Sequence, residues 1–254
     1  MTMYVDVAGR GPNLALLHGW GMNSAVWDGV LEPLARHFTV HRVDLPGHGR
    51  SAGAPVTTPE AFAAAVLGVL PARTHLLGWS LGGHMALRIA ATEPARIGRL
   101  ITVGSTPRFT AAADWPLGKS PAILADFAAR LSRDYSLTIR NFLALQALQM
   151  PNARQVVRAL QESIDRHGAP NVDALQACLG VLNVSDVREA VRTLSHPALV
   201  IQGDHDALTS TGAAEWLAAN LPNAEYCLMP HAAHAPFLSH REEFLAHVLG
   251  FLQR

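Results

Sequence analysis

The sequence predicts an α/β protein with a mostly parallel central sheet, helices on both faces of the sheet, and an inserted helical segment. Three observations lead to this prediction. Short apolar runs alternate with longer stretches of helical periodicity over about the first hundred residues, and the same alternation returns near the C-terminal end. Between these two parts, residues 109–191 show helical periodicity and no convincing strand.

The expected strands are short apolar runs, which is typical of strands that are buried on both faces. They are 14–17 (LALL), 39–43 (TVHRV), 75–77 (HLL), 100–103 (LITV), 198–201 (ALVI) and 226–229 (YCLM). The helices expected between and after them are 25–36, 59–70, 81–92, 211–219 and 242–252. We therefore expect a core built from residues 1–108 and 192–254.

Residues 109–191 are expected to form a helical lid. The stretches LADFAARLSRDY, IRNFLALQALQ and ARQVVRALQESI place apolar residues at i, i+3 and i+4. A helical insertion between two parts of a parallel sheet is well placed to cover the carboxyl edge of that sheet. Open α/β sheets bind their ligands at this edge.

The composition excludes several classes of partner. The chain has 254 residues and 49% apolar residues, enough for one hydrophobic core. Its formal net charge is zero, so we expect neither nucleic acid nor an anionic membrane as a partner. The N-terminus does not resemble a signal peptide and no run is long enough to span a membrane, so a cytoplasmic protein is expected. Cys178 and Cys227 lack metal-type spacing and are interpreted as small buried hydrophobes.

Ser80 is the candidate nucleophile. It is the centre of a Gly-x-Ser-x-Gly pattern (GWSLG, 78–82) that follows an expected strand and precedes an expected helix. Gly78 and Gly82 leave room for a sharp turn, and the helix directs its free N–H groups at the same place. The pattern alone also fits a glycine-rich turn with a passive serine. The residues of the other loops are therefore needed to distinguish a nucleophile from a passive serine.

A serine hydroxyl needs a base to remove its proton. In this architecture the acid and then the histidine follow the last strands of the sheet. The segment MPHAAHAPFLSH (229–240) comes after the last expected strand. His234, in the middle of this loop, is the first choice for the base and His231 is the second. His240 is expected at the start of the terminal helix, too late in the loop.

The acid is expected after the preceding strand, in ALVIQGDHDALT (198–209). Asp206 starts the loop into the next helix and is our choice, whereas Asp204 is interpreted as a turn or capping residue. The role of Asp206 would be to orient the imidazole of the base and to stabilise its charged form.

A third loop, LLHGWGMN (16–23), is expected to supply the oxyanion hole. The donors would be the backbone N–H groups of Trp20 and of Leu81, the residue after the nucleophile. His18, which precedes a turn glycine, is interpreted as a structural hydrogen-bonding residue. His48 lies in the Gly/Pro turn VDLPGHGRS (43–51), which is also interpreted as structural.

Together these motifs resemble the α/β-hydrolase superfamily over the whole chain. More closely, the chain resembles the pimeloyl-[acyl-carrier protein] methyl ester esterases of biotin synthesis. LLHGWGMN, VDLPGHGRS and LLGWSLGGHMAL are common to the superfamily, whereas Trp20, Trp79, the lid segment NFLALQ and AAHAPFLSH are more specific. One departure is GSTPRF (104–109), where Arg108 stands in place of a cysteine.

The resemblance implies that Ser80, Asp206 and His234 form a catalytic triad and that Trp20 and Leu81 form the oxyanion hole. It also implies a substrate site lined by Trp20, Phe142, Leu143, Ala144, Leu145 and Gln146. The implied activity is that of a serine carboxylester hydrolase that demethylates a pimeloyl ester on acyl carrier protein through an acyl-enzyme. We expect a monomer that needs no metal and no cofactor.

Two other kinds of function fit the same motifs. Within the fold, the chain could be a general short-chain carboxylesterase, a C–C hydrolase, a lyase or a perhydrolase. Outside enzymology, it could be a non-catalytic binding module, since a fold does not determine a function.

The lid offers a hint about the partner. Between Arg130 and Arg158 the chain has five arginines and one acidic residue. Arg154 and Arg158 are four apart, hence on one helix face, and Arg140 lies in the preceding expected helix. Because acyl carrier proteins are acidic, Arg140, Arg154 and Arg158 are candidate carrier contacts. A solvated arginine face is the alternative.

Overall fold

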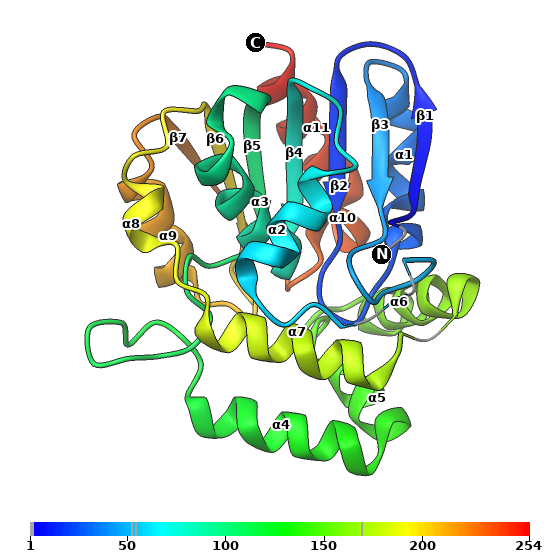
Figure 1. Ribbon diagram of the computed structural model, residues 1–254. Coiled ribbons are helices and arrows are strands. Elements are labelled where there is room, and N and C mark those ends of the chain that lie inside the picture. Colours follow the sequence, from blue (N-terminus) through cyan, green and yellow to red (C-terminus); the bar gives the residue numbers. More distant parts are fainter. Residues whose placement is uncertain (1–2, 52, 54, 169) are drawn as a thin grey trace.

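A sheet of seven strands in the order β1-β3-β2-β4-β5-β6-β7 forms the centre of the computed structural model, which describes residues 3–51, 53, 55–168 and 170–254 (Figure 1). The strands are β1 (Val5–Gly9), β2 (Asn13–Leu17), β3 (Thr39–Val43), β4 (Thr74–Trp79), β5 (Ile97–Val103), β6 (Ala198–Gly203) and β7 (Ala224–Met229). β1 pairs antiparallel with β3, and every other pairing in the sheet is parallel. The predicted α/β fold is confirmed.

Strand β1 has no counterpart among the predicted strands. It lies at the edge of the sheet, and all five of its residues are at least partly exposed. Its residues VDVAG include an aspartate and end in glycine, so they do not form the long apolar run that is typical of a strand buried on both faces. A search for apolar runs therefore passes over it.

The helices flank this sheet and continue into the segment between β5 and β6. Those in the described residues are α1 (Asp28–Ala35), α2 (Pro59–Leu67), α3 (Leu81–Thr92), α4 (Pro121–Arg133), α5 (Tyr135–Leu145), α6 (Ala153–His167), α7 (Val172–Val184), α8 (Arg188–Val191), α9 (Thr211–Asn220), α10 (Pro236–Ser239) and α11 (Arg241–Leu252), with 3-10 turns η1 (Ser24–Trp27) and η2 (Pro94–Arg96). The expected helix 25–36 starts as the turn η1, and the Asn23 side chain caps this start by accepting a hydrogen bond from the Ala25 N–H. None of the described helices is long and apolar enough to cross a membrane.

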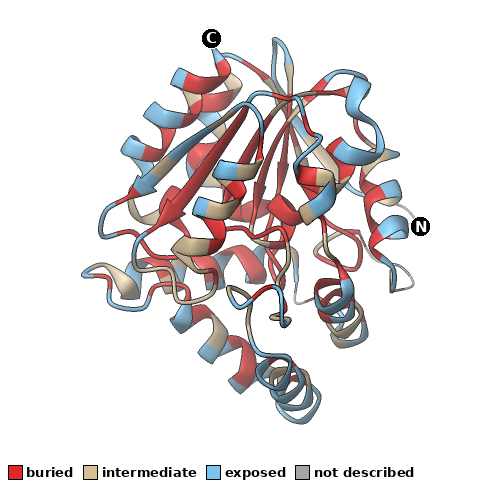
Figure 2. Ribbon diagram, turned by 90° about the vertical axis from the view of Figure 1, so that its left-hand side faces the viewer, coloured by how far each residue is buried: buried red, intermediate tan, exposed pale blue. Residues whose placement is uncertain are grey.

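Helices cover both faces of the sheet. α1 and α11 contact each other and lie behind the strands in Figure 1, whereas α2 and α3 pack together in front of them. The strands are largely buried, while the outer sides of the helices are exposed (Figure 2). The apolar core lies where these layers meet, as the interior of an α/β protein requires.

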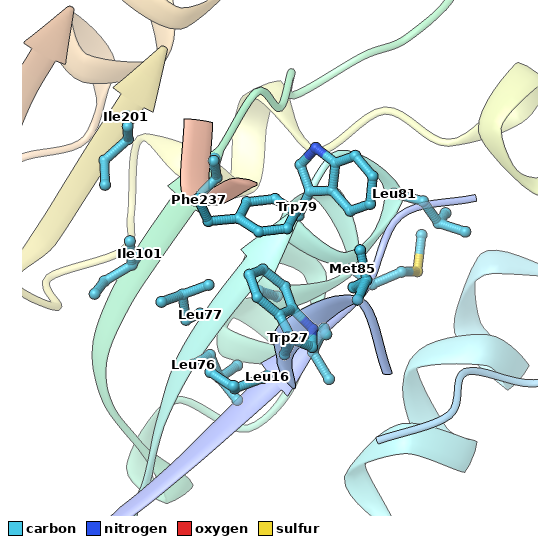
Figure 3. Close-up of a cluster of buried hydrophobic side chains, with 14 of the residues drawn as sticks. Leu16, Trp27, Leu76, Leu77, Trp79, Leu81, Met85, Ile101, Ile201 and Phe237 are labelled. Atoms are coloured by element: carbon cyan, nitrogen blue, oxygen red, sulfur yellow. The ribbon is translucent and has the colours of Figure 1, made fainter. Parts of the chain in front are cut away.

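A cluster of large side chains fills the core beneath the end of β4. Trp79, the last residue of β4, packs against Phe237 from α10 with ring centroids 5.0 Å apart. Phe237 in turn packs on Trp27 of η1, with ring centroids 4.5 Å apart. Figure 3 shows these rings above the leucines of β2 and β4. This packing supports the turn that follows β4.

Helices α4–α7 lie beyond the carboxyl ends of the strands (Figure 1). α6 contacts η1, and α4 contacts α5 and α7. Where the chain leaves and re-enters the sheet, Arg108 Nη1 lies 2.9 Å from Asp186 Oδ2, so the two connections are held side by side. The helical segment therefore faces the sheet edge at which a ligand is expected to bind.

Candidate active site

Ser80 occupies a strained turn between β4 and α3. Its backbone has φ +54° and ψ −116°, a region that residues other than glycine rarely adopt. The Ser80 N–H donates to the Val103 carbonyl of β5 at 2.9 Å, and the Ser80 carbonyl accepts from the His84 N–H at 3.0 Å. These bonds hold a conformation that costs free energy on its own, and such strain is found mainly at functional sites.

Gly78 and Gly82 let this turn pack against its neighbours. A Cβ atom on Gly78 would lie 2.3 Å from the Gly82 carbonyl oxygen, and one on Gly82 would lie 2.2 Å from the Leu17 carbonyl oxygen at the end of β2. Both distances are far below any normal contact. A side chain at Gly78 would therefore collide with the first turn of α3, and one at Gly82 would collide with the end of β2.

His234 and Asp206 form a buried pair. His234 Nδ1 lies 2.7 Å from Asp206 Oδ2, and the side chains are 1% and 0% exposed. Asp206 Oδ1 accepts from the backbone N–H groups of Leu208 and Thr209, at 2.8 and 3.0 Å. Oδ2 also accepts from Thr209 Oγ1 at 2.7 Å and from Gln202 Nε2 at 3.0 Å. Burial opposes the charge of Asp206, but the His234 imidazole and these hydrogen bonds hold its pKa below the ordinary value.

The acceptor at Asp206 fixes the tautomer of His234. An ionised carboxylate only accepts hydrogen bonds, so Nδ1 carries the proton and Nε2 has the free lone pair of a base. The His234 backbone is also held: its carbonyl accepts from Trp79 Nε1 at 2.8 Å, and its N–H donates to the Gln146 carbonyl at 3.2 Å. The residue before Ser80 and the residue after α5 thus both position the histidine loop.

Gly104 is a site residue that the sequence analysis did not identify. It follows β5 with φ +51°, and a Cβ atom there would lie 3.0 Å from His234 Nδ1 and 3.1 Å from Asp206 Oδ2. The sequence feature that indicates such a position is a glycine directly after a buried strand. Because Gly104 has no side chain, His234 and Asp206 can pack directly against its backbone.

The predicted oxyanion donors lie in the loop after β2, which carries Trp20, and at the start of α3, which carries Leu81. Within the described part of the chain, neither the Trp20 N–H nor the Leu81 N–H donates to a protein acceptor. Leu81 is the first residue of α3, where a helix leaves its N–H groups free. Both amides are thus available to a negatively charged oxygen.

Two buried histidines hold this loop. His18 Nδ1 donates to the Gly19 carbonyl at 2.8 Å, and its Nε2 accepts from the Leu45 N–H at 2.9 Å. His48 Nε2 accepts from the Gly21 N–H at 3.1 Å. Burial lowers the pKa of His18 to about 4 and that of His48 to about 3, so both are neutral and able to accept. The structural roles predicted for these histidines agree with these contacts.

An apolar cavity of about 190 Å³ opens onto Ser80. Its lining comprises Trp20, Ser80, Phe109, Lys119, Ile123, Leu124, Phe127, Phe142, Leu145, Leu179, Leu182, Ala207 and Leu208. Most of these side chains come from the helical segment between β5 and β6. The Lys119 ammonium, the one charged group in the lining, donates to the Ala207 carbonyl at 2.8 Å, beside Asp206.

The predicted substrate residues of α5 do not all face this cavity. Phe142 and Leu145 line it, whereas Leu143 and Ala144 line a second hollow between α5 and α6. Gln146 is fully buried beside the His234 loop, and its side-chain amide has no hydrogen-bond partner among the described residues. The difference arises because successive residues of a helix point about 100° apart.

The alternative candidates for base and acid lie elsewhere. His231 and Asp204 are exposed and neither takes part in the His234–Asp206 pair. His240 directly precedes α11, as expected.

A strained serine turn after a parallel strand, with an aspartate and a histidine on the loops after β6 and β7, is the arrangement typical of an α/β hydrolase. The family model described as "alpha/beta hydrolase fold" matches residues 12–241, and the chain belongs to this family.

Sequence comparison shows which α/β hydrolases this chain resembles. A pimeloyl-[acyl-carrier protein] methyl ester esterase of Nitrosomonas europaea is 42% identical over 245 residues, which cover 96% of this chain and 97% of that protein. The enzyme of the same name from Aeromonas hydrophila is 41% identical over 254 residues, 99% and 100% of the two chains. Among solved structures, a bromoperoxidase from Bacillus anthracis has a TM-score of 0.93 at 21% identity, over 99% of this chain and 95% of that one. This last likeness shows the fold alone.

Replacing Gly104 by alanine should impair the acid–histidine pair without unfolding the protein. We expect Gly104→Ala to lower kcat/KM for a p-nitrophenyl ester by about tenfold or more, because the new methyl group displaces His234 or Asp206. Gly180→Ala in α7 is the control, since a Cβ atom there has nothing within 4 Å. Unchanged kcat/KM in a folded Gly104→Ala protein would contradict this account.

The buried neutral histidines should make the fold sensitive to acid. His18, His48 and His84 have pKa values lowered by burial to about 4, 3 and 4. Between pH 6.5 and about 4 the unfolded chain binds protons that the folded chain does not, so the free energy of unfolding falls as the pH falls.

Each such histidine contributes a slope of about 1.4 kcal/mol per pH unit in this window. Urea unfolding at several pH values measures the slope. His84→Gln should reduce it by about one histidine's share, whatever its effect on stability at pH 7. An unchanged slope in that variant would show that His84 is protonated in the folded state.

Proposed function

We propose that this chain is a serine carboxylic ester hydrolase that removes the methyl group from a pimeloyl ester carried on acyl carrier protein, in biotin synthesis. The observation that carries the chemistry is the buried His234–Asp206 pair, 2.7 Å apart, next to a strained serine turn that opens into an apolar cavity. The substrate is proposed from the names of relatives that match over nearly the whole chain.

In the proposed reaction Ser80 Oγ attacks the ester carbonyl while His234 Nε2 takes its proton. Asp206 stabilises the resulting imidazolium. The backbone N–H groups of Trp20 and Leu81 donate to the oxyanion, and each such donor is typically worth about 2.7–4 kcal/mol in the transition state. His234 then gives its proton to the departing methanol. Finally a water molecule, deprotonated by His234, hydrolyses the acyl-enzyme and restores Ser80.

The cavity suits the acyl part of such a substrate. Its walls are mostly aliphatic and aromatic side chains, which favour a methylene chain over a polar one. Burial of each CH₂ group is worth about 0.8 kcal/mol. Trp20 is part of this wall, and its ring packs edge-on against Phe142 and Phe127.

The candidate carrier contacts gather around the second hollow. Arg140, Arg154 and Arg158 line this hollow of about 520 Å³ between α5 and α6. Arg158 pairs with Glu162 at 2.7 Å, whereas Arg140 and Arg154 make no ion pair with any described residue. Arg140 is on α5, which lines the cavity at Ser80, and Arg154 is on α6 next to it. Exposed arginines without an ion pair at this place support docking of an acidic carrier, whose approach they would accelerate.

Active-site labelling tests the serine chemistry. A fluorophosphonate should modify the native protein at one site, and Ser80→Ala should abolish the labelling together with ester hydrolysis. Failure of the native protein to react would favour a binding module. A label that persists in the variant would exclude Ser80 as nucleophile.

Charge reversal tests the carrier surface. Arg154→Glu combined with Arg158→Glu should lower kcat/KM for a carrier-linked methyl ester by about tenfold or more, yet spare a p-nitrophenyl ester, because only the first substrate has an acidic carrier. Arg10→Glu combined with Arg36→Glu, two exposed residues outside the lid, is a control of equal charge.

An equal loss of kcat/KM for the carrier-linked ester and for the p-nitrophenyl ester would contradict docking of the carrier at these arginines. A native preference for short simple esters over the carrier-linked ester would instead identify a general carboxylesterase.

A further inference from the structure

Three side chains with metal-binding groups meet on the loops that follow β6 and β7. Asp204 and His205 follow β6, and His231 follows β7. One ligand atom from each of the three lies within 4.8 Å of the others. None of these groups has a role in the proposed reaction.

Backbone hydrogen bonds fix the two loops against each other. The His205 N–H donates to the Ala232 carbonyl at 2.9 Å, and the Asp204 N–H donates to the Met229 carbonyl at 3.2 Å. His231 has φ +58°, a left-handed conformation that non-glycine residues rarely adopt. The backbone thus brings the three side chains together independently of any attraction between them.

The three side chains lie close together without hydrogen bonds between their ligand atoms among the described residues. His205 Nε2 lies 3.9 Å from Asp204 Oδ1, and the rings of His205 and His231 have centroids 5.8 Å apart. Nδ1 of His205 is buried and has no hydrogen-bond partner among the described residues. No hydrogen bond of the ring therefore accounts for where the His205 imidazole lies.

Two imidazoles and one carboxylate are a donor set that suits zinc, with water as a fourth ligand. In a tetrahedral zinc site with bonds of about 2.0–2.1 Å, the ligand atoms lie about 3.4 Å apart. The distances in the cluster are somewhat longer. Asp204 and His231 are exposed, so a small rotation of their side chains can close the difference.

We propose that Asp204, His205 and His231 bind one divalent transition-metal ion, with Zn²⁺ as the best-matched ion. The ion would link the loop that carries Asp206 to the loop that carries His234. It would therefore stabilise the folded chain by mass action. The sequence indicated no metal site, because the ligands come from two segments separated by a helix and a strand.

Zinc titration of the protein without an affinity tag tests the proposal. In competition with a chromophoric zinc indicator, we expect one equivalent of Zn²⁺ to bind and the Tm to rise. His205→Gln and His231→Asn should each weaken binding by about tenfold or more and remove the rise in Tm. Asparagine is chosen at 231 because it tolerates positive φ. Both measurements are independent of esterase activity.

His247→Ala is the matched control, because His247 is an exposed histidine on α11 outside the cluster. It should bind zinc as the native chain does. The proposal would be overturned by absence of stoichiometric binding to the native chain. It would equally be overturned by unchanged affinity in folded His205→Gln and His231→Asn proteins, as judged by their Tm without zinc.

Discussion

The close approach of the Ser80 turn to the end of β2 is the constraint on which the rest of the site depends. Gly82 lies so near the Leu17 carbonyl that no side chain fits between them. This contact brings the start of α3 beside the loop after β2, and so places two backbone amides from distant segments near one serine. The strained backbone of Ser80 is tolerated because β5 and α3 hold it from both sides.

Buried polar groups, each with a defined partner, keep the surrounding loops in place. His18 and His48 act as neutral acceptors for backbone N–H groups, and burial keeps both of them neutral well below the ordinary pKa of histidine. Asp206 remains charged in an equally buried place because four donors besides His234 converge on its oxygens: two backbone amides, the Thr209 hydroxyl and the Gln202 amide. Burial thus keeps the histidines neutral, whereas Asp206 stays charged against the effect of burial because His234 and its hydrogen-bond donors stabilise the carboxylate.

The sequence was sufficient to predict strands β2–β7 and to choose Asp206 and His234 as candidates, because parallel strands give apolar runs and their loops follow in a fixed order. Asp206 and His234, chosen by their places after two such runs, lie 2.7 Å apart in the structure. Edge strand β1 was missed because it is only partly buried. Gly104 was missed because its role depends on groups distant in the chain. Leu143 and Ala144 point toward α6 because of the way α5 packs in the fold, and the periodicity of the sequence does not determine this packing.

The hydrogen bond from the His234 N–H to the Gln146 carbonyl has a consequence for how a substrate enters. Gln146 directly follows helix α5, so a movement of that end of α5 would leave the buried backbone N–H of His234 without its acceptor. Such a loss costs about 1–3 kcal/mol. Helix α4 carries Ile123, Leu124 and Phe127 of the cavity wall and, among the described residues, makes no hydrogen bond to the His234 loop, so its displacement would not incur this cost. The two helices would then have different roles: α4 would move when a ligand enters or leaves, whereas the end of α5 would stay in place and hold the His234 loop.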